Sequence, residues 1–138
     1  QWLVGAMERL QSHSSGNPCS VSQAAAVAAF EGPQDFLAGW RETFRQRRDA
    51  VAGRINAVPG LSCPLPDGAF YLMVDAKPLL HKVGIDDNAL GLRLLDHGVA
   101  IVPASAFGGG DGFRISFAAR MESLDAACSR IAAACAEL

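Results

Sequence analysis

The stretch from about Gln34 to Val58 constrains the fold most, because its apolar residues recur at helical steps of three, four or seven. The opposite side carries charged residues of both signs, which is typical of a solvated helix face rather than a nucleic-acid-binding stripe. Pro59-Gly60 is a strong signal for the end of a helix. The segment therefore predicts one long amphipathic helix, with these residues on its apolar side: Phe36, Trp40, Phe44, Val51, Ile55 and Val58.

The segments around this helix predict further helices first and strands later. Helical spacing covers residues 2–10 and, after a polar break, residues 19–30, for which Asn17 is a candidate cap and Pro18 a first-turn residue. Strand patterns at 67–76, 99–103 and 113–119 alternate with a helix at 86–98, and a closing helix follows, with Glu122 or Ser123 as its candidate cap. This order predicts an α+β fold, a small sheet of about three strands with helices on one face.

Composition excludes several classes of partner. Half of the residues are hydrophobic and 19% are charged, as in globular domains. The formal net charge of −2 predicts no attraction to nucleic acid or to an anionic membrane, and no apolar run reaches the ~20 residues of a membrane span. The chain begins without Met and enters helical periodicity at once, so we expect it to be part of a longer protein.

Four cysteines and three histidines predict neither a metal site nor a disulfide. The cysteines contain no C-x-x-C pair, and Cys128 and Cys135 are too far apart along one helix for a disulfide. We expect four reduced, mostly buried thiols in a cytoplasmic protein. The histidines are scattered and adjoin no obvious nucleophile: His13, His81 and His97.

Arg114 interrupts the apolar alternation of the last predicted strand. Side chains alternate faces along a strand, so Phe113, Ile115 and Phe117 point one way and Arg114 the other. The arginine is then either an exposed residue or the wall of a cleft, where its planar fork suits a carboxylate. The preceding glycine-rich stretch 107–113 predicts a flexible turn, because a strand follows it where a phosphate-binding loop would open a helix.

Four segments in this order resemble the C-terminal third of class I/II aminotransferases, which are enzymes dependent on pyridoxal phosphate (PLP). They are SSGNPCSVSQAAAVAAFEGPQDF, PGLSCPLPDGAFYLM, GVAIVPASAFG and FRISFA. The likeness covers nearly the whole chain and is greatest to bacterial aspartate aminotransferases. It implies the small domain of PLP-dependent transferase fold type I for residues 34–138. Residues 1–33 would pack on the large domain and the subunit interface of a homodimer.

The resemblance assigns roles to three residues. Arg114 matches the arginine that binds the substrate α-carboxylate, Phe70 an aromatic that lines the substrate side of the cleft, and Asn17 a stretch near the subunit interface and the neighbouring active site. Ala104 stands where many relatives have glycine, which leaves the backbone of that loop in question. The implied substrates are an amino acid, with aspartate the first expectation, and a 2-oxo acid.

The resemblance also implies reactive groups that these residues do not supply. The family chemistry needs a lysine that forms a Schiff base with the cofactor. Lys77 and Lys82 are the only lysines, both in a segment between a strand and a helix. We expect this part alone to be inactive and not to bind PLP. Two alternatives stay open: a non-catalytic α+β ligand-binding module, and another fold-type I aminotransferase or lyase.

Overall fold

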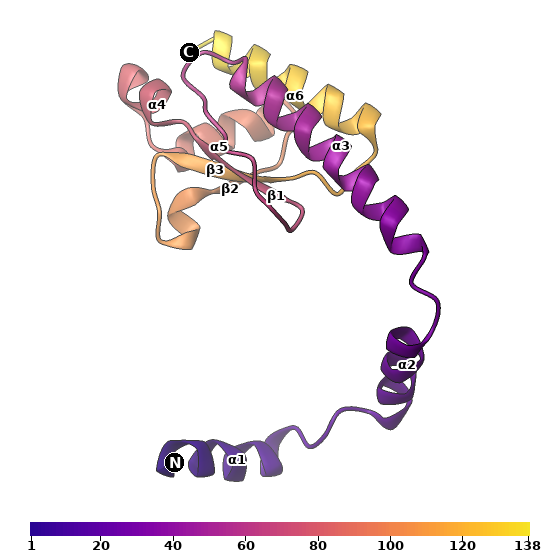
Figure 1. The fold of residues 1–138 in the computed structure, drawn as a ribbon. Helices are drawn as coiled ribbons and strands as arrows, with labels where there is room; N and C mark the ends of the chain where they lie inside the picture. Colours follow the sequence, from indigo (N-terminus) through magenta and orange to yellow (C-terminus); the bar gives the residue numbers. More distant parts are fainter. The chain divides into compact units, whose positions relative to one another are not determined.

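The computed structural model describes all 138 residues, and the chain divides into two compact units, Gln1–Leu37 and Ala38–Leu138. The first unit contains helix α1, Trp2–Ser14, and helix α2, Ser20–Glu31, neither of which has a buried residue (Figure 1). None of the helices combines the length and apolar character that crossing a membrane requires.

Both N-terminal helices differ from the prediction at their ends. Helix α1 continues to Ser14. The hydroxyl of this serine donates to the carbonyl of Leu10, one helical turn earlier, so the side chain bonds within the helix. Helix α2 is capped by Cys19, so the prediction of Asn17 as the cap was wrong. The Cys19 backbone is extended and its carbonyl accepts the first helical bond from Gln23, which leaves Asn17 and Pro18 outside the helix.

Helix α3, Phe36–Asn56, confirms the long predicted helix, but only its second half is buried. Val51 and Ile55 are in the core, whereas Phe36 and Trp40 are 51% and 62% exposed. Beyond the helix, the Asn56 side chain both donates to the Cys63 carbonyl, at 3.0 Å, and accepts from the Cys63 N–H, at 2.7 Å. These two hydrogen bonds close the turn at Pro59-Gly60 and bring the chain back toward the sheet.

Three antiparallel strands form the sheet in the order β1-β3-β2. Strand β1 is Tyr71–Asp75, β2 is Val102–Pro103 and β3 is Gly112–Ser116. The predicted α+β sheet of about three strands is therefore confirmed, although each strand is shorter than its apolar pattern. Strand β2 ends at Pro103, which has no N–H to donate to a ladder.

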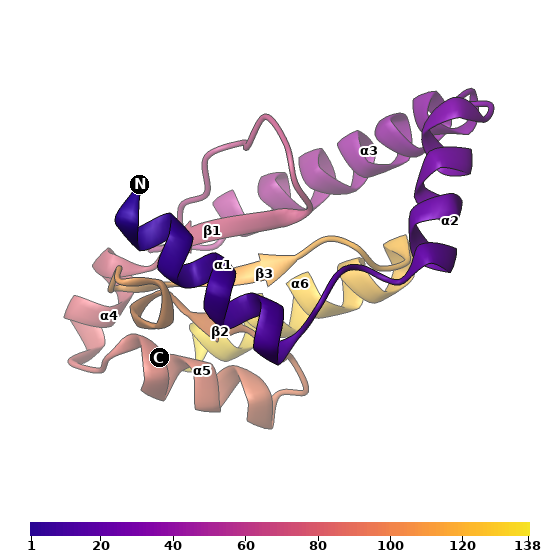
Figure 2. The same cartoon turned by 90° about the horizontal axis from the view of Figure 1, so that it is seen from below.

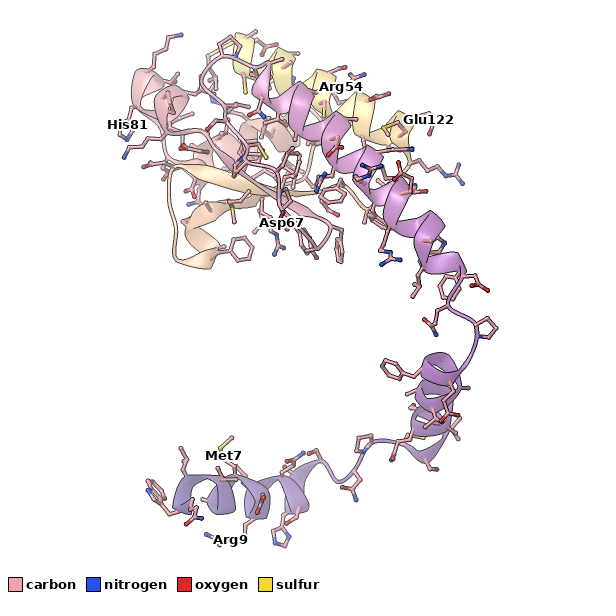
Figure 3. All side chains as sticks on the ribbon, viewed as in Figure 1. Met7, Arg9, Arg54, Asp67, His81 and Glu122 are labelled. Carbon is pink, nitrogen blue, oxygen red and sulfur yellow. The ribbon has the colours of Figure 1, made fainter.

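Helices cover one face of this sheet. The helices are α3, α5 (Asp87–Asp96) and α6 (Met121–Ala136). Four strand residues are buried against them: Leu72, Val74, Phe113 and Ile115. Figure 1 shows these helices on one side of the sheet, and Figure 2 shows the same fold turned by 90° and seen from below. An ion pair of 3.0 Å between Arg54 and Asp125 also joins α3 to α6; Figure 3 labels Arg54.

Three local features were not predicted correctly. Helix α4, Lys77–Val83, fills a segment that the sequence left between a strand and a helix. A 3-10 turn, η1, spans Ala104–Phe107 inside the predicted loop. Helix α6 begins two or three residues earlier than expected, because its cap is the extended Arg120, whose carbonyl accepts from the N–H groups of Ser123 and Leu124.

Candidate functional site

Arg114 lies in the central strand, on the face of the sheet that the helices leave open. Its partners across the ladder are Met73 of β1 and Val102 of β2, so these three side chains share that face. The neighbours Phe113 and Ile115 are buried on the other face, and Arg114 itself is half-buried. The predicted alternation along this strand is thus confirmed.

Two aromatic rings contact the Arg114 guanidinium. Its Cζ lies 4.2 Å from the centre of the Tyr71 ring and 4.3 Å from the centre of the Phe107 ring. Tyr71 comes from β1 and Phe107 from the end of η1, so the strand pairing and the 3-10 turn together place the rings. A cation held over aromatic faces is stabilised by their quadrupoles and loses freedom to rotate.

The N–H groups of the Arg114 guanidinium have no acceptor within the chain. The five ion pairs of the structure involve other residues, and no side-chain hydrogen bond includes Arg114. Arginine presents five N–H donors in a rigid fork that matches a carboxylate with two parallel hydrogen bonds. A half-buried guanidinium that is oriented by rings and has no anionic partner is suited to receive an external carboxylate.

A hollow of about 590 Å³ lies between β1, η1 and the loop before β3. Met73 and Phe107 line it and are also neighbours of Arg114, although Arg114 is not among the lining residues. The charged side chains of the hollow are Asp75, Lys77 and Asp111, so it does not concentrate positive charge. Lys77 is the one cation of the lining, whereas Arg114 is linked to the hollow only through its neighbours Met73 and Phe107.

The sheet geometry requires a glycine at the position where β3 begins. A Cβ at Gly112 would collide with the carbonyl oxygen of Val74, so glycine is required where the two backbones meet. Asp111 has a φ of 59°, in the left-handed region, and its carbonyl accepts from the N–H of Ala76 at 2.8 Å. The loop is thereby pinned to the end of β1, and β3 enters the sheet in one register.

The other two predicted site residues lie elsewhere. Phe70 is 42% exposed, and its ring centre is 4.3 Å from that of Tyr71, so it is one ring removed from Arg114. Its backbone carbonyl accepts from the N–H of Phe117 at 2.9 Å, which fixes its position beside the sheet. Asn17 lies in the exposed turn between α1 and α2, within the N-terminal unit.

Sequence reasoning missed Tyr71 and Phe107, the two rings on Arg114. Tyr71 had a usable signal, because it shares the strand parity of Met73, and cross-strand partners occupy the same face. Phe107 had none, because it belongs to a segment that reads locally as a flexible glycine-rich loop. The 3-10 turn that carries it ends at Gly108, whose backbone is left-handed.

The cysteines divide into two environments. Cys63, Cys128 and Cys135 are buried, and burial raises the pKa of each thiol. Cys19 is exposed at the start of α2, where hydrogen bonds from the backbone N–H groups of Ser22 and Val21 lower the pKa of its thiol. The expectation of mostly buried thiols is confirmed for three of the four.

Neither lysine is placed as a Schiff-base amine. Lys77 and Lys82 both lie on α4, and both are exposed. An amine that forms a Schiff base with a carbonyl cofactor is activated by burial or by a neighbouring cation, which these positions do not provide. The residues of this chain therefore do not fit PLP as its covalent holder.

Comparison with known proteins identifies the family. The model of the family "Aminotransferase class I and II" matches residues 1–131. The aspartate/prephenate aminotransferase of Cereibacter sphaeroides is 46% identical over 99% of this chain and 36% of its own length. The aspartate aminotransferase of Rhizobium meliloti is 45% identical over 99% of this chain and 35% of its own length.

Solved structures agree with the sequences. The crystal structure of the Rhizobium meliloti aspartate aminotransferase superimposes with a TM-score of 0.86 at 43% identity, over 97% of this chain and 35% of that one. The alanine aminotransferase of Pyrococcus furiosus gives a TM-score of 0.85 at 32% identity, over 97% of this chain and 34% of that one. These neighbours confirm the PLP-dependent transferase fold type I. The chain spans about a third of the length of the curated relatives it matches, and it belongs to the class I and II aminotransferases.

Proposed function

We propose that this chain forms the carboxylate-binding part of a PLP-dependent aminotransferase that moves an amino group between an amino acid, with aspartate the first candidate, and a 2-oxo acid. The observation that carries the proposal is the half-buried Arg114, which contacts two aromatic rings and has no acidic partner in the chain. Relatives named as aspartate and aspartate/prephenate aminotransferases support the reaction and the first substrate.

In this proposal Arg114 orients the substrate. Both the amino acid and the 2-oxo acid carry a carboxylate next to the reacting carbon, so one guanidinium serves both half-reactions. Two parallel charge-assisted hydrogen bonds fix the plane of that carboxylate and hence the direction of the bond from Cα to hydrogen. Tyr71 and Phe107 restrict the guanidinium before the substrate arrives, which reduces the entropy lost on binding.

The remaining roles belong to the same proposal. Phe70 lines the substrate side of the cleft, and Asn17 lies near the subunit interface of a homodimer. Residues 1–33 pack against the large domain, and residues 34–138 are the small domain. PLP, when bound in the full-length enzyme, supplies the electron sink of the reaction, and the lysine that holds it belongs to residues outside this chain. The full-length enzyme is cytoplasmic.

The test is Arg114→Ala in the full-length enzyme. Loss of a charge-assisted fork should weaken binding by about 1.5–3 kcal/mol, or about 10- to 150-fold in the KM of both the amino acid and the 2-oxo acid. Arg120→Ala is a matched control, because it removes an arginine outside the sheet. Unchanged KM values for both substrates in Arg114→Ala would remove the carboxylate-binding role.

The non-catalytic module makes a different prediction and is motivated by the exposed positions of both lysines. Isothermal titration of residues 1–138 with succinate, without cofactor, separates the two functions. Tight saturable binding that Arg114→Ala abolishes, together with no transamination by the full-length protein, would favour the module. Binding only in the full-length protein, with amino transfer, supports the enzyme.

A further inference from the structure

Asp87 is the one charged side chain that is buried, at 5% exposure. An ionised carboxylate is costly to bury unless hydrogen bonds or a counter-charge compensate for its lost hydration. None of the five ion pairs includes Asp87, so hydrogen bonds and the positive end of α5 compensate for its burial. It lies in the first turn of α5, directly after the exposed cap residue Asp86.

The hydrogen bonds of Asp87 connect α5 to η1. Its Oδ2 accepts from the backbone N–H of Ser105 at 2.7 Å. Its Oδ1 accepts from the Asn88 side chain at 3.2 Å, and the same amide nitrogen lies 3.4 Å from the Ser105 hydroxyl. The shortest of these bonds joins a buried carboxylate to the backbone of the 3-10 turn, 18 positions further along the chain.

The turn that Asp87 holds is short and carries one wall of the Arg114 site. Turn η1 has four residues, and a 3-10 segment of this length has poor hydrogen-bond geometry of its own. Its last residue, Phe107, is 47% exposed, yet its ring lies 4.3 Å from the Arg114 guanidinium. An anchor outside the turn is therefore needed to keep this ring in place.

We propose that Asp87 is a positioning residue, which anchors η1 through the Ser105 N–H so that Phe107 stays against Arg114 and orients its guanidinium. Two contacts of the structure link Asp87 to Arg114: the hydrogen bond from the Ser105 N–H and the Phe107 ring on the guanidinium. The effect of this link on substrate binding rests on the proposed function. Asp87 does not touch the substrate in this scheme; it acts through the backbone of η1 and one aromatic ring.

Four variants isolate the hydrogen bond from its surroundings. Asp87→Ala removes the acceptor, and Asp87→Leu removes it while filling the buried space, which keeps the test usable if the alanine variant does not fold. Asp87→Asn keeps an oxygen acceptor for the Ser105 N–H. Asp86→Ala is the matched control, since it removes a neighbouring carboxylate that accepts only from the Ala89 N–H.

The first measurement does not depend on the proposed function. Proton–nitrogen NMR of residues 1–138 observes the Nε–Hε group of Arg114, assigned by its loss in Arg114→Lys. We expect Asp87→Ala and Asp87→Leu to move this resonance toward its position in Phe107→Leu, and Asp87→Asn and Asp86→Ala to leave it in place. An unmoved resonance in a folded Asp87→Leu protein would overturn the proposal and leave Asp87 a purely structural role.

The second measurement uses the full-length enzyme. We expect Asp87→Leu to raise the KM for both substrates about 2- to 5-fold, the effect of one ring contact, with a smaller change in kcat. Asp87→Asn should restore the KM values. If Asp87→Leu moves the resonance and the full-length wild type performs no amino transfer, the proposed function fails while the positioning role stands. Equal KM values in an active enzyme would overturn the link to substrate binding.

Discussion

At the scale of single residues, the environment of Arg114 differs from that of the three arginines that form ion pairs. Arg45, Arg48 and Arg54 each pair with an acidic side chain of the chain itself. Arg114 instead contacts two aromatic rings and keeps its N–H groups available. The difference follows from its place in a central strand, where aromatic residues rather than carboxylates are within reach.

The aromatic contacts of Arg114 predict graded effects on carboxylate affinity. Tyr71→Leu and Phe107→Leu each remove one ring and keep apolar bulk. We expect each to weaken succinate binding to the full-length enzyme by about 0.5–1 kcal/mol, or about 2- to 5-fold, measured by calorimetric titration. Phe44→Leu is the control, since its ring packs on Phe117 rather than on the Arg114 guanidinium. A larger loss in Phe44→Leu than in both others would contradict this reading of the site.

The thiols predict a strict order of chemical reactivity. Cys19 is exposed and its pKa is lowered, so it has more reactive thiolate at neutral pH than the three buried thiols, whose pKa values are raised. Iodoacetamide at pH 7.5 should therefore label one cysteine of residues 1–138 rapidly and the rest only in urea, as followed by mass spectrometry. Cys19→Ser should abolish the fast phase. Rapid labelling at Cys63 or Cys128 would show that the core opens readily.

At the scale of elements, the β1–β3 pair holds the site together. It places Met73 opposite Arg114 and Asp75 opposite Gly112. The pairing ends at a glycine because the backbone of β1 passes too close for any side chain there. The same pairing puts Tyr71 on the face where Arg114 needs it.

Two glycines near the start of β3, one in the strand and one in the preceding loop, predict opposite tolerance of alanine. Gly112→Ala forces a methyl group into the Val74 carbonyl and should destabilise the domain by about 2 kcal/mol or more, as in overpacked cores. Gly110→Ala meets no atom within 4 Å and should stay close to wild type. Urea unfolding followed by circular dichroism compares the two midpoints. Equal midpoints would mean that β1 and β3 separate without cost, and the register described here would be wrong.

At the scale of the whole molecule, the two units differ in how their side chains are buried. Residues Ala38–Leu138 contain all the buried residues, including the core of α3, α5, α6 and the sheet. Helices α1 and α2 have 13 and 12 residues and bury none. Helices of about this length are marginal in water without tertiary packing. Their exposed apolar residues include Trp2, Met7, Leu10 and Phe30.

This contrast predicts the pattern of hydrogen exchange in residues 1–138. Amides of residues 1–33 should exchange fast, as in helices that are only marginally stable. Amides of residues 113–135 should exchange slowly, because they become exposed only when the whole domain unfolds. Mass spectrometry after deuterium labelling measures both segments in one sample, with ultracentrifugation to establish that the sample is monomeric. Equal protection of the two segments in a monomer would show that the first unit has packing partners within the chain.

Sequence reasoning predicted most elements and part of the site, and its errors have local causes. The long helix, the sheet class and the faces of β3 follow from periodicity, which depends on neighbouring residues alone. Caps were wrong at α2 and α6, because whether the chain turns helical at Cys19 or at Arg120 depends on backbone angles that several residues tolerate. Arg114 was found by its unusual place in an apolar strand, whereas Asp87 and Phe107 carried no signal of their own.

The amino-acid sequence by itself determined the fold class and the family, and it singled out the arginine of the proposed site, because the spacing of apolar residues and the family motifs are local features of the sequence. Only the tertiary structure decided what surrounds that arginine. The contacts of Tyr71, Phe107 and Asp87 join strand β1, turn η1 and helix α5, which are distant in sequence. Such contacts arise when the sheet pairs and the helices pack, so no local pattern encodes them.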